Sequence, residues 1–345
     1  MKKVLVTGCA GFIGFHISEK LLKQSVEVIG IDNLSRSGSE NNLSILDTYE
    51  NFKFFKADIR NFEEISKIFQ QYIGIDLIIH QAAQVAVTTS ITDPRLDFDT
   101  NALGTFNLLE ATRLFSPDSV FQFASTNKVY GTMEELEVIE VDGKYNYKKL
   151  KKGVNEEFNL DLHSPYGCSK GVADQYVRDY NRIYGLKTMV LRQSCIYGTR
   201  QFGVEDQGWV AWFAIASILG KKTTIYGDGK QARDLLWIDD LVDAYIALYE
   251  KSDLASGQIF NLGGGSENIL SLNELVDYLS KDNLMKINPQ FSSWRPGDQK
   301  IYVSDIKKIN ELTGWKPKTS TKEGIKLLID WCKKNGNLLG DVLNK

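Results

Sequence analysis

The chain has 345 residues, of which 43% are hydrophobic and 25% charged, with a formal net charge of −3. These values are ordinary for a globular protein with one large domain or two smaller ones. With its basic residues scattered, the chain gives no reason to expect a nucleic-acid or membrane partner.

The first predicted unit is a strand, a tight turn and a helix. A β-branched, apolar run from Lys3 to Thr7 ends at Gly8, and the spacing Gly8-x-x-Gly11-x-x-Gly14 then opens an amphipathic stretch from Phe12 to Leu22. Glycines let the backbone turn sharply and approach a pyrophosphate, while the helix N-terminus offers free N–H groups to the phosphates. The pattern predicts a dinucleotide site.

A carboxylate after the second predicted strand indicates which dinucleotide binds. The apolar run from Glu27 to Ile31 ends in Asp32, at the position where an acidic residue accepts hydrogen bonds from the adenosine ribose. Arg36 is suited to a 2′-phosphate, but Asp32 would repel that phosphate. We therefore expect NAD rather than NADP.

Strand and helix signals continue to alternate through the first half of the chain. Strands are expected over 52–56, 77–81 and 120–125, and helices over 62–72 and after Asn101. This order predicts an α/β fold with a Rossmann-type, doubly wound parallel sheet. Strand ends in such sheets face the ligand crevice. The strand-end residues expected beside the cofactor are Asp58, Ala82, Ala83 and Thr126.

Tyr166 and Lys170 form a candidate proton-transfer pair. They are four residues apart and so share one face of a predicted helix. A free phenol has a pKa of about 10 and is a poor base at neutral pH. An ammonium one turn away favours phenolate, which would let Tyr166 take a proton from a hydroxyl group.

The second half of the chain predicts a smaller C-terminal α/β lobe for the substrate. Apolar runs over 192–197 and 223–226 are separated by the aromatic stretch 209–213. We expect residues 1–191 and 232–258 to form the NAD-binding domain, and residues 192–231 and 259–345 to form the lobe. The connection from 131 to 163 is unusually long, which indicates a lid, an outer flap or a solvated loop.

Several motifs together resemble the extended short-chain dehydrogenase/reductase family, in its nucleotide-sugar class. They are the glycine motif, Asp58, His80-x-Ala82-Ala83, Asn101, Thr126 and Tyr166-x-x-x-Lys170. Within that class, residues 125–131, 163–170, 197–202 and 206–209 resemble the CDP-tyvelose (CDP-paratose 2-) epimerases. The resemblance implies a bound NAD that is reduced and reoxidised in each turnover, and a CDP-sugar or another nucleotide sugar as substrate.

The resemblance also implies roles for individual residues. The catalytic residues are Thr126, Tyr166 and Lys170. The cofactor residues are Gly8, Gly11, Phe12, Ile13, Gly14, Asp32, Asn33, Asp58, Ile59, Ala82, Ala83, Asn101 and Gln193, with Tyr166 and Lys170. The substrate residues are Gln84, Asn127, Cys195, Gln201, Phe202, Arg233 and Arg295, of which the two arginines hold the diphosphate.

Two substrate-side positions depart from the family pattern. Cys195 stands where many relatives have Asn, which puts one diphosphate contact in doubt because a thiol is a weak donor. Gln193 replaces a more usual Tyr.

The same residues leave several reactions open. Epimerisation needs Tyr166 to take a hydroxyl proton while hydride passes to NAD and later returns to the opposite face of the keto sugar. A 4,6-dehydratase would carry an Asp-Glu pair where this chain has Asn127 and Lys128, so dehydration lacks its acid and base. A UDP-sugar 4-epimerase, a net dehydrogenase and a non-catalytic NAD-binding protein remain as alternatives.

The resemblance implies a homodimer or homotetramer. In this family the helices after Asn101 and Tyr166 form an interface between subunits, and we expect Leu108 and Val172 to be exposed there.

The remaining expectations concern metals, thiols and location. The cysteines, which are Cys9, Cys168, Cys195 and Cys332, lack metal-ligand spacing, so we expect reduced thiols and no metal. With neither a signal segment nor an apolar run of membrane-spanning length, a cytoplasmic location is expected.

Overall fold

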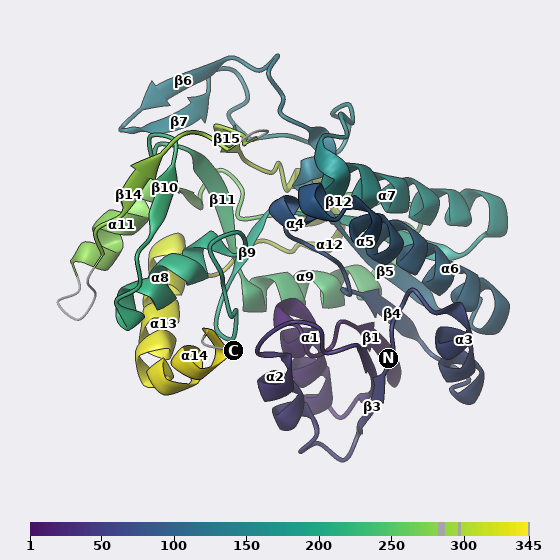
Figure 1. The fold of residues 1–345 in the computed structure, drawn as a ribbon. Coiled ribbons are helices and arrows are strands. Elements are labelled where there is room, and N and C mark those ends of the chain that lie inside the picture. The colour runs from purple at the N-terminus through teal and green to yellow at the C-terminus, as the bar shows by residue number, and fades with distance from the viewer. Residues whose placement is uncertain (282–286, 296–297, 344–345) are drawn as a thin grey trace.

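A seven-stranded parallel sheet forms the centre of the larger domain (Figure 1). The computed structural model describes residues 1–281, 287–295 and 298–343. The strands, in spatial order, are β12 (Ile259–Leu262), β8 (Lys187–Gln193), β5 (Val120–Thr126), β4 (Leu77–His80), β1 (Lys3–Thr7), β2 (Glu27–Asp32) and β3 (Phe52–Lys56). Neighbouring strands are parallel throughout, which confirms the predicted Rossmann-type sheet.

Alternate side chains of each strand enter two separate cores. Val4 and Val6 of β1 pack on one face with α1 (Phe12–Lys23) and α9 (Ile238–Glu250). Leu5 points to the other face, where the sheet is covered by α3 (Phe62–Gln71), α6 (Gly104–Phe115) and α7 (Ser164–Tyr184). Burial on both faces explains why the strands read as apolar runs. Shorter helices of this domain are α2 (Ser39–Leu46), α4 (Val87–Thr92), α5 (Pro94–Phe98) and α10 (Ser252–Ala255).

The smaller lobe is built around β11 (Ala232–Trp237). This strand pairs with β9 (Cys195–Tyr197) and β15 (Ile301–Tyr302) in parallel and with β13 (Ile269–Ser271) antiparallel. A separate pair joins β10 (Thr224–Tyr226) to β14 (Gln290–Ser292). The remaining helices are α8 (Trp209–Leu219), α11 (Leu272–Ser280), α12 (Lys307–Thr313), α13 (Thr321–Lys334) and α14 (Gly336–Leu343).

Two strands cross the domain division that the sequence predicts. β12, expected in the lobe, pairs with β8 and closes one edge of the seven-stranded sheet. β11, expected in the NAD-binding domain, is instead the centre of the lobe sheet. Pairing with distant strands decides both positions, and this pairing has no local sequence signal.

The long connection from 131 to 163 contains an antiparallel hairpin, β6 (Val138–Val141) and β7 (Lys144–Tyr147), at the outer edge of the lobe (Figure 1). The hairpin is fastened to the lobe: Tyr145 N donates to Lys230 O at 3.0 Å, and the Tyr145 hydroxyl donates to Asp228 at 2.7 Å. The segment is therefore an ordered flap rather than a solvated loop.

Helices α6 and α7 expose aromatic side chains, but these are not Leu108 and Val172, which we expected from the sequence to be exposed. Leu108 is fully buried in the core, and Val172 is half-buried. The exposed apolar residues here include Phe106 and Tyr176, whose rings meet edge to face with centroids 5.7 Å apart. The expectation for Leu108 was wrong because its side chain packs inward with Leu109 and Val177.

Among the described residues, no helix is both long and apolar enough to cross a membrane.

Candidate active site

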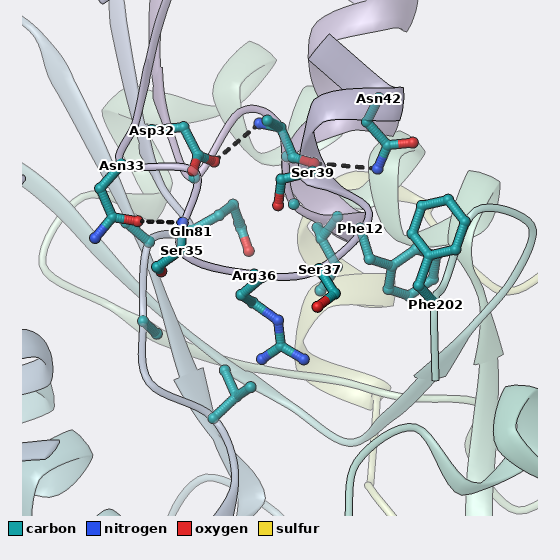
Figure 2. Close-up of a pocket in the computed structure, with 18 of the residues that line it drawn as sticks. Phe12, Asp32, Asn33, Ser35, Arg36, Ser37, Ser39, Asn42, Gln81 and Phe202 are labelled. Carbon is teal, nitrogen blue, oxygen red and sulfur yellow. Dashed lines mark hydrogen bonds between the residues drawn. The ribbon is translucent and has the colours of Figure 1, made fainter. Parts of the chain in front are cut away.

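The ends of β1, β2, β3 and β4 surround a cavity (Figure 2). The predicted cofactor residues that line it are Gly8, Gly11, Phe12, Ile13, Gly14, Asp32, Asn33, Asp58, Ile59, Ala82 and Ala83. They come from the four strand ends and from the start of α1, as the glycine motif and the strand order predict.

Two glycines of the motif are required by close backbone approach. Gly8 has a φ of +69°, which disfavours any residue with a side chain. A Cβ on Gly14 would lie 2.0 Å from the carbonyl oxygen of Gly8, so only glycine lets α1 begin this close to the turn. The N-terminus of α1 is thereby held at the cavity wall, where its N–H groups fit a pyrophosphate.

Asp32 lies at the end of β2 with both carboxylate oxygens anchored. They accept hydrogen bonds from Ala10 N at 3.0 Å and Leu34 N at 2.8 Å. Burial raises the pKa of Asp32, and these backbone donors oppose that rise. Each oxygen retains acceptor capacity for a ribose hydroxyl, so the residues present fit a dinucleotide.

Asp58 also lines the cavity, but its carboxylate is already paired. Arg60 Nη2 lies 2.7 Å from it, and Asn33 Nδ2 donates to it at 3.1 Å. The hydrogen bond from Arg60 lowers the pKa of Asp58 to about 2.

A segment of the smaller lobe, residues 199–207, forms one wall of the dinucleotide cavity. Gln201 and Phe202, expected at the substrate, line this cavity instead. Figure 2 shows Asp32 and Asn33 on one side of the cavity and Phe202 on the other. The physical reason is close packing of Phe202 on Gly38, where a Cβ would lie 2.3 Å from the Phe202 ring.

Polar contacts fasten the same segment to the larger domain. Arg36 donates to Gln207, and Arg200 Nη1 donates to Asn42 Oδ1 at 3.2 Å. Arg200 and Gln207 were not predicted from the sequence. Arg200 lies in the motif over 197–202 and Gln207 in the motif over 206–209, but their roles depend on contacts with the larger domain, which the motifs alone do not indicate.

The three predicted catalytic residues lie at the end of β5 and in the first turns of α7. Thr126 ends β5, while Pro165 at the second position of α7 starts the helix that carries Tyr166 and Lys170. Ser164 Oγ accepts a hydrogen bond from Gly167 N at 3.2 Å and so caps this helix start. Tyr166 is 8% exposed and Lys170 3% exposed.

Burial is the largest cause of the pKa shifts of both Tyr166 and Lys170. It raises the pKa of Tyr166 to about 12, with a hydrogen bond from Thr126 opposing the rise and Asp97 adding to it. It lowers the pKa of Lys170 to about 7, with Asp97 and Asp174 opposing the fall. The lowering of the Tyr166 pKa by Lys170 that the spacing predicts is not found, because burial sets the direction of the shift and the opposing contribution comes from Thr126.

Three predicted ligand-binding amides are used within the protein. Asn101 is buried, and its side-chain amide bonds the backbone of Gln84 rather than reaching the cavity. The Gln84 side chain bonds Ala86 and Asp97. Gln193 Nε2 donates to the Tyr245 hydroxyl at 2.6 Å. Gln84, Asn101 and Gln193 thus bond within the protein and lie outside the lining of the dinucleotide cavity.

On the lobe side, both predicted diphosphate arginines are paired with carboxylates. Arg233 Nη2 lies 2.9 Å from Asp298, and Arg295 Nη2 lies 2.9 Å from Asp206. The Arg295 guanidinium also stacks over the Tyr226 ring at 3.9 Å. Residues 296 and 297, which follow Arg295, lie outside the described residues.

Cys195 is held by a neighbouring indole rather than by a polar ligand contact. Its sulfur accepts a hydrogen bond from Trp209 Nε1 at 3.1 Å, and burial raises the pKa of the thiol to about 12. All four cysteines are free thiols.

Asn127 and Lys128 connect the catalytic strand end to the lobe. Asn127 is buried and follows Thr126 directly. Burial lowers the pKa of Lys128 to about 8, and the nearby Arg233 adds to this effect while Asp298 opposes it. The position after Thr126 therefore presents an amide and an amine, with no carboxylic acid.

Comparisons with known proteins agree over almost the whole chain. The chain is 42% identical over 336 residues to CDP-paratose 2-epimerase of Salmonella typhi, covering 95% of this chain and 98% of that one. It resembles the UDP-glucose 4-epimerase of Thermotoga maritima with UDP-glucose, at a TM-score of 0.84 and 33% identity, covering 96% and 99% of the two chains. It also resembles the UDP-glucose 4-epimerase of Thermus thermophilus in complex with NAD, at a TM-score of 0.80 and 32% identity, covering 96% and 99% of the two chains.

A family model described as GDP-mannose 4,6 dehydratase matches residues 5–328. The glycine turn, the strand order and the Thr-Tyr-Lys residues described above agree with this match. The chain therefore belongs to the GDP-mannose 4,6 dehydratase family.

Proposed function

We propose that the protein is an NAD-dependent nucleotide-sugar epimerase that converts CDP-paratose to CDP-tyvelose by inversion at C2. The observation that carries this proposal is the arrangement around Thr126: Tyr166 and Lys170 lie buried nearby, and Asn127 and Lys128 follow in sequence. NAD is supported by the cavity at the glycine turn and by the NAD complex of a relative.

In this mechanism the protein moves a proton and anchors the nucleotide. Bound NAD supplies the two-electron chemistry, accepting a hydride from the sugar carbinol carbon and returning it. Tyr166 Oη takes the proton of the same hydroxyl, leaving a ketone, and gives it back after the sugar has turned. The hydrogen bond from Thr126 favours the phenolate of Tyr166, and Lys170 in its ammonium form does the same.

The arginines keep the nucleotide in place while the keto sugar turns. When the substrate binds, Arg233 leaves Asp298 and Arg295 leaves Asp206, and both arginines bind the diphosphate. Their guanidinium groups suit this role because they are planar and permanently charged. Such an anchor leaves the sugar free to present either face to the cofactor.

Dehydration is disfavoured by the residues after Thr126, despite the family's name. Elimination of water from a sugar needs an acid and a base beside the ring. Asn127 is an amide that offers neither, and Lys128 cannot act as a carboxylic acid. Epimerisation needs neither group.

The CDP-sugar assignment rests on the 42% identity to CDP-paratose 2-epimerase and on the motifs at 125–131, 163–170, 197–202 and 206–209. The alternative is a UDP-sugar 4-epimerase, which the structural neighbour with UDP-glucose favours. Both reactions would use the same Thr126, Tyr166 and Lys170.

Proton NMR of the purified protein with CDP-paratose, run beside UDP-glucose, distinguishes the two. CDP-tyvelose should appear without NADH absorbance, and Tyr166→Phe serves as the matched control that keeps the fold but lacks the base. Conversion of UDP-glucose alone would overturn the substrate assignment. NADH accumulating in proportion to consumed sugar would replace epimerisation with net dehydrogenation.

We also propose a homodimer through α6 and α7 and a cytoplasmic location. The exposed aromatic pair Phe106 and Tyr176 supports the interface. Light scattering of the wild type and of Phe106→Glu should show a dimer and a monomer, respectively. A monomeric wild type would contradict the proposal.

A further inference from the structure

Asp97 is a carboxylate enclosed in protein beside the catalytic helix. It lies in α5 with no exposed surface. Its Oδ1 accepts hydrogen bonds from Gln84 Nε2 at 2.8 Å and Asn101 Nδ2 at 3.2 Å, and its Oδ2 accepts one from Ser169 Oγ. These donors come from the loop after β4, from the residues before α6 and from α7, so one carboxylate ties three segments together.

Asn101 strengthens this connection from an unusual turn. It lies in a π-helical turn over Asp99–Leu103, a conformation often found at functional sites. Its amide pairs with the backbone of Gln84 in both directions, at 2.9 Å each, and donates to Ser169 Oγ at 3.1 Å. The loop that carries Gln84 is thereby held in a fixed position relative to Asp97.

A hydrogen-bond chain continues from Asn101 to β1. The Thr105 hydroxyl donates its hydrogen to Asn101 O at 2.6 Å. The Thr105 oxygen can then only accept, so it accepts a hydrogen bond from His80 Nε2 at 3.0 Å. His80 Nδ1 then accepts from Thr7 Oγ1 at 2.8 Å. Each group in the chain is satisfied with His80 neutral, and burial lowers the pKa of His80 well below its usual value.

Asp97 has no ion pair within the described residues, and it reaches the catalytic helix at Ser169, the residue directly before Lys170, where its charge acts on Lys170. Asp174, on the same helix as Lys170, is already engaged by a bidentate contact with Arg192. His80, which faces Lys170 from β4, is neutral. The Phe123 ring also lies beside Lys170, with its centroid 4.3 Å from Lys170 Nζ.

We propose that Asp97 is a positioning residue of the reaction, whose carboxylate keeps Lys170 in its ammonium form beside Tyr166. The hydrogen bonds to Asn101 and Ser169 hold that carboxylate in place. Asp97 lies outside the lining of the dinucleotide cavity, so it acts through Lys170 and not on a ligand. The inference rests on the proposed function, which gives Tyr166 and Lys170 their roles.

The test is the pH dependence of Asp97→Asn, which keeps the size of the side chain and removes its charge. Asp97 raises the pKa of both Lys170 and Tyr166. Without it both groups lose their protons at lower pH, so both limbs of the kcat profile should move to lower pH, by about one unit or more. KM for the nucleotide sugar should change little.

Asp93→Asn is the matched control. Asp93 is an exposed carboxylate that caps the same short helix by accepting a hydrogen bond from Leu96 N at 2.9 Å. Its replacement should leave the profile in place. A profile of Asp97→Asn that superimposes on the wild type, even at a reduced rate, would overturn the proposal and leave Asp97 a purely structural residue.

A second readout does not depend on any sugar. In NAD-loaded protein labelled with ¹³C at the tyrosine Cζ, the Tyr166 resonance is assigned by its loss in Tyr166→Phe and followed against pH. Phenolate should form at lower pH in Asp97→Asn than in the wild type, and identical curves would refute the inference. If the wild type converted no nucleotide sugar, the proposed function would fail while this titration still decided the role of Asp97. If Asp97→Asn does not fold, Asp97→Ser is measured in the same way.

Discussion

Breaking the ion pair between Asp174 and Arg192 by removing one partner should strongly destabilise the protein. The two side chains are 0% and 1% exposed, and Arg192 Nε and Nη2 lie 2.9 and 3.0 Å from the two carboxylate oxygens. Ser125 Oγ donates to the same carboxylate at 2.8 Å. Replacing Asp174 by Leu would leave a buried guanidinium with the Tyr130 hydroxyl, at 3.1 Å, as its remaining hydrogen-bond partner among the described residues.

An uncompensated buried charge of this kind costs about 3–5 kcal/mol in the free energy of unfolding. Arg192→Met should cost a similar amount because it leaves the carboxylate unpaired. The double variant, Asp174→Leu with Arg192→Met, removes both charges and should recover most of the loss. The coupling free energy between the two positions should therefore reach at least about 2 kcal/mol.

Equilibrium urea unfolding, followed by far-ultraviolet circular dichroism, measures these differences. The protein should be stripped of nucleotide first, because bound ligand adds its own stabilisation. If the double variant were as unstable as the sum of the two single variants, the loss would come from packing, and the reasoning about buried charge would be wrong.

Three further changes test the ligand sites. Tyr166→Phe should lower turnover at least about 100-fold, as expected on removal of a general base, while the NAD content of the purified protein stays unchanged; near-normal turnover would contradict the mechanism. Asp32→Ala should weaken NAD binding more than NADP binding in calorimetry, because Asp32 is placed to accept from the ribose hydroxyls; an unchanged preference would mean that it does not read the ribose. Asp298→Asn should bind CDP about 1.5- to 5-fold more tightly, since breaking a partly exposed ion pair costs about 0.2–1 kcal/mol; weaker binding would show that Asp298 orients Arg233 instead.

The sheet and the dinucleotide site could be predicted because their signals are local. Gly8, Gly14 and Asp32 occupy fixed positions relative to strand ends, and the predicted strands of the first half appear in the structure. β12 could not be assigned in this way, because it joins β8 from far along the chain. The hairpin β6–β7 was missed although the sequence carries a signal for it, the Asp142-Gly143 turn between the two strands, whose residues both have positive φ.

The roles of the polar side chains were harder to predict from the sequence than the fold. Gln84 and Asn101 look like ligand contacts in the sequence, yet partners from other elements use up their amides. Asp97 looks like one more acidic residue in a polar stretch, and its burial depends on Ser169, far along the chain in α7. Which donors and acceptors are already paired depends on residues far apart in the sequence, so a local motif does not predict it.

The segment 199–207, which forms one wall of the dinucleotide cavity, bears on whether NAD leaves the protein between turnovers. The contacts of Arg36 with Gln207, of Arg200 with Asn42 and of Phe202 with Gly38 hold this segment at the cavity wall, where it would oppose release of the cofactor. An enzyme that returns its hydride in every cycle has no need of such release. Its cofactor then behaves as a resident prosthetic group, and catalysis becomes independent of the NAD to NADH ratio in the surrounding solution.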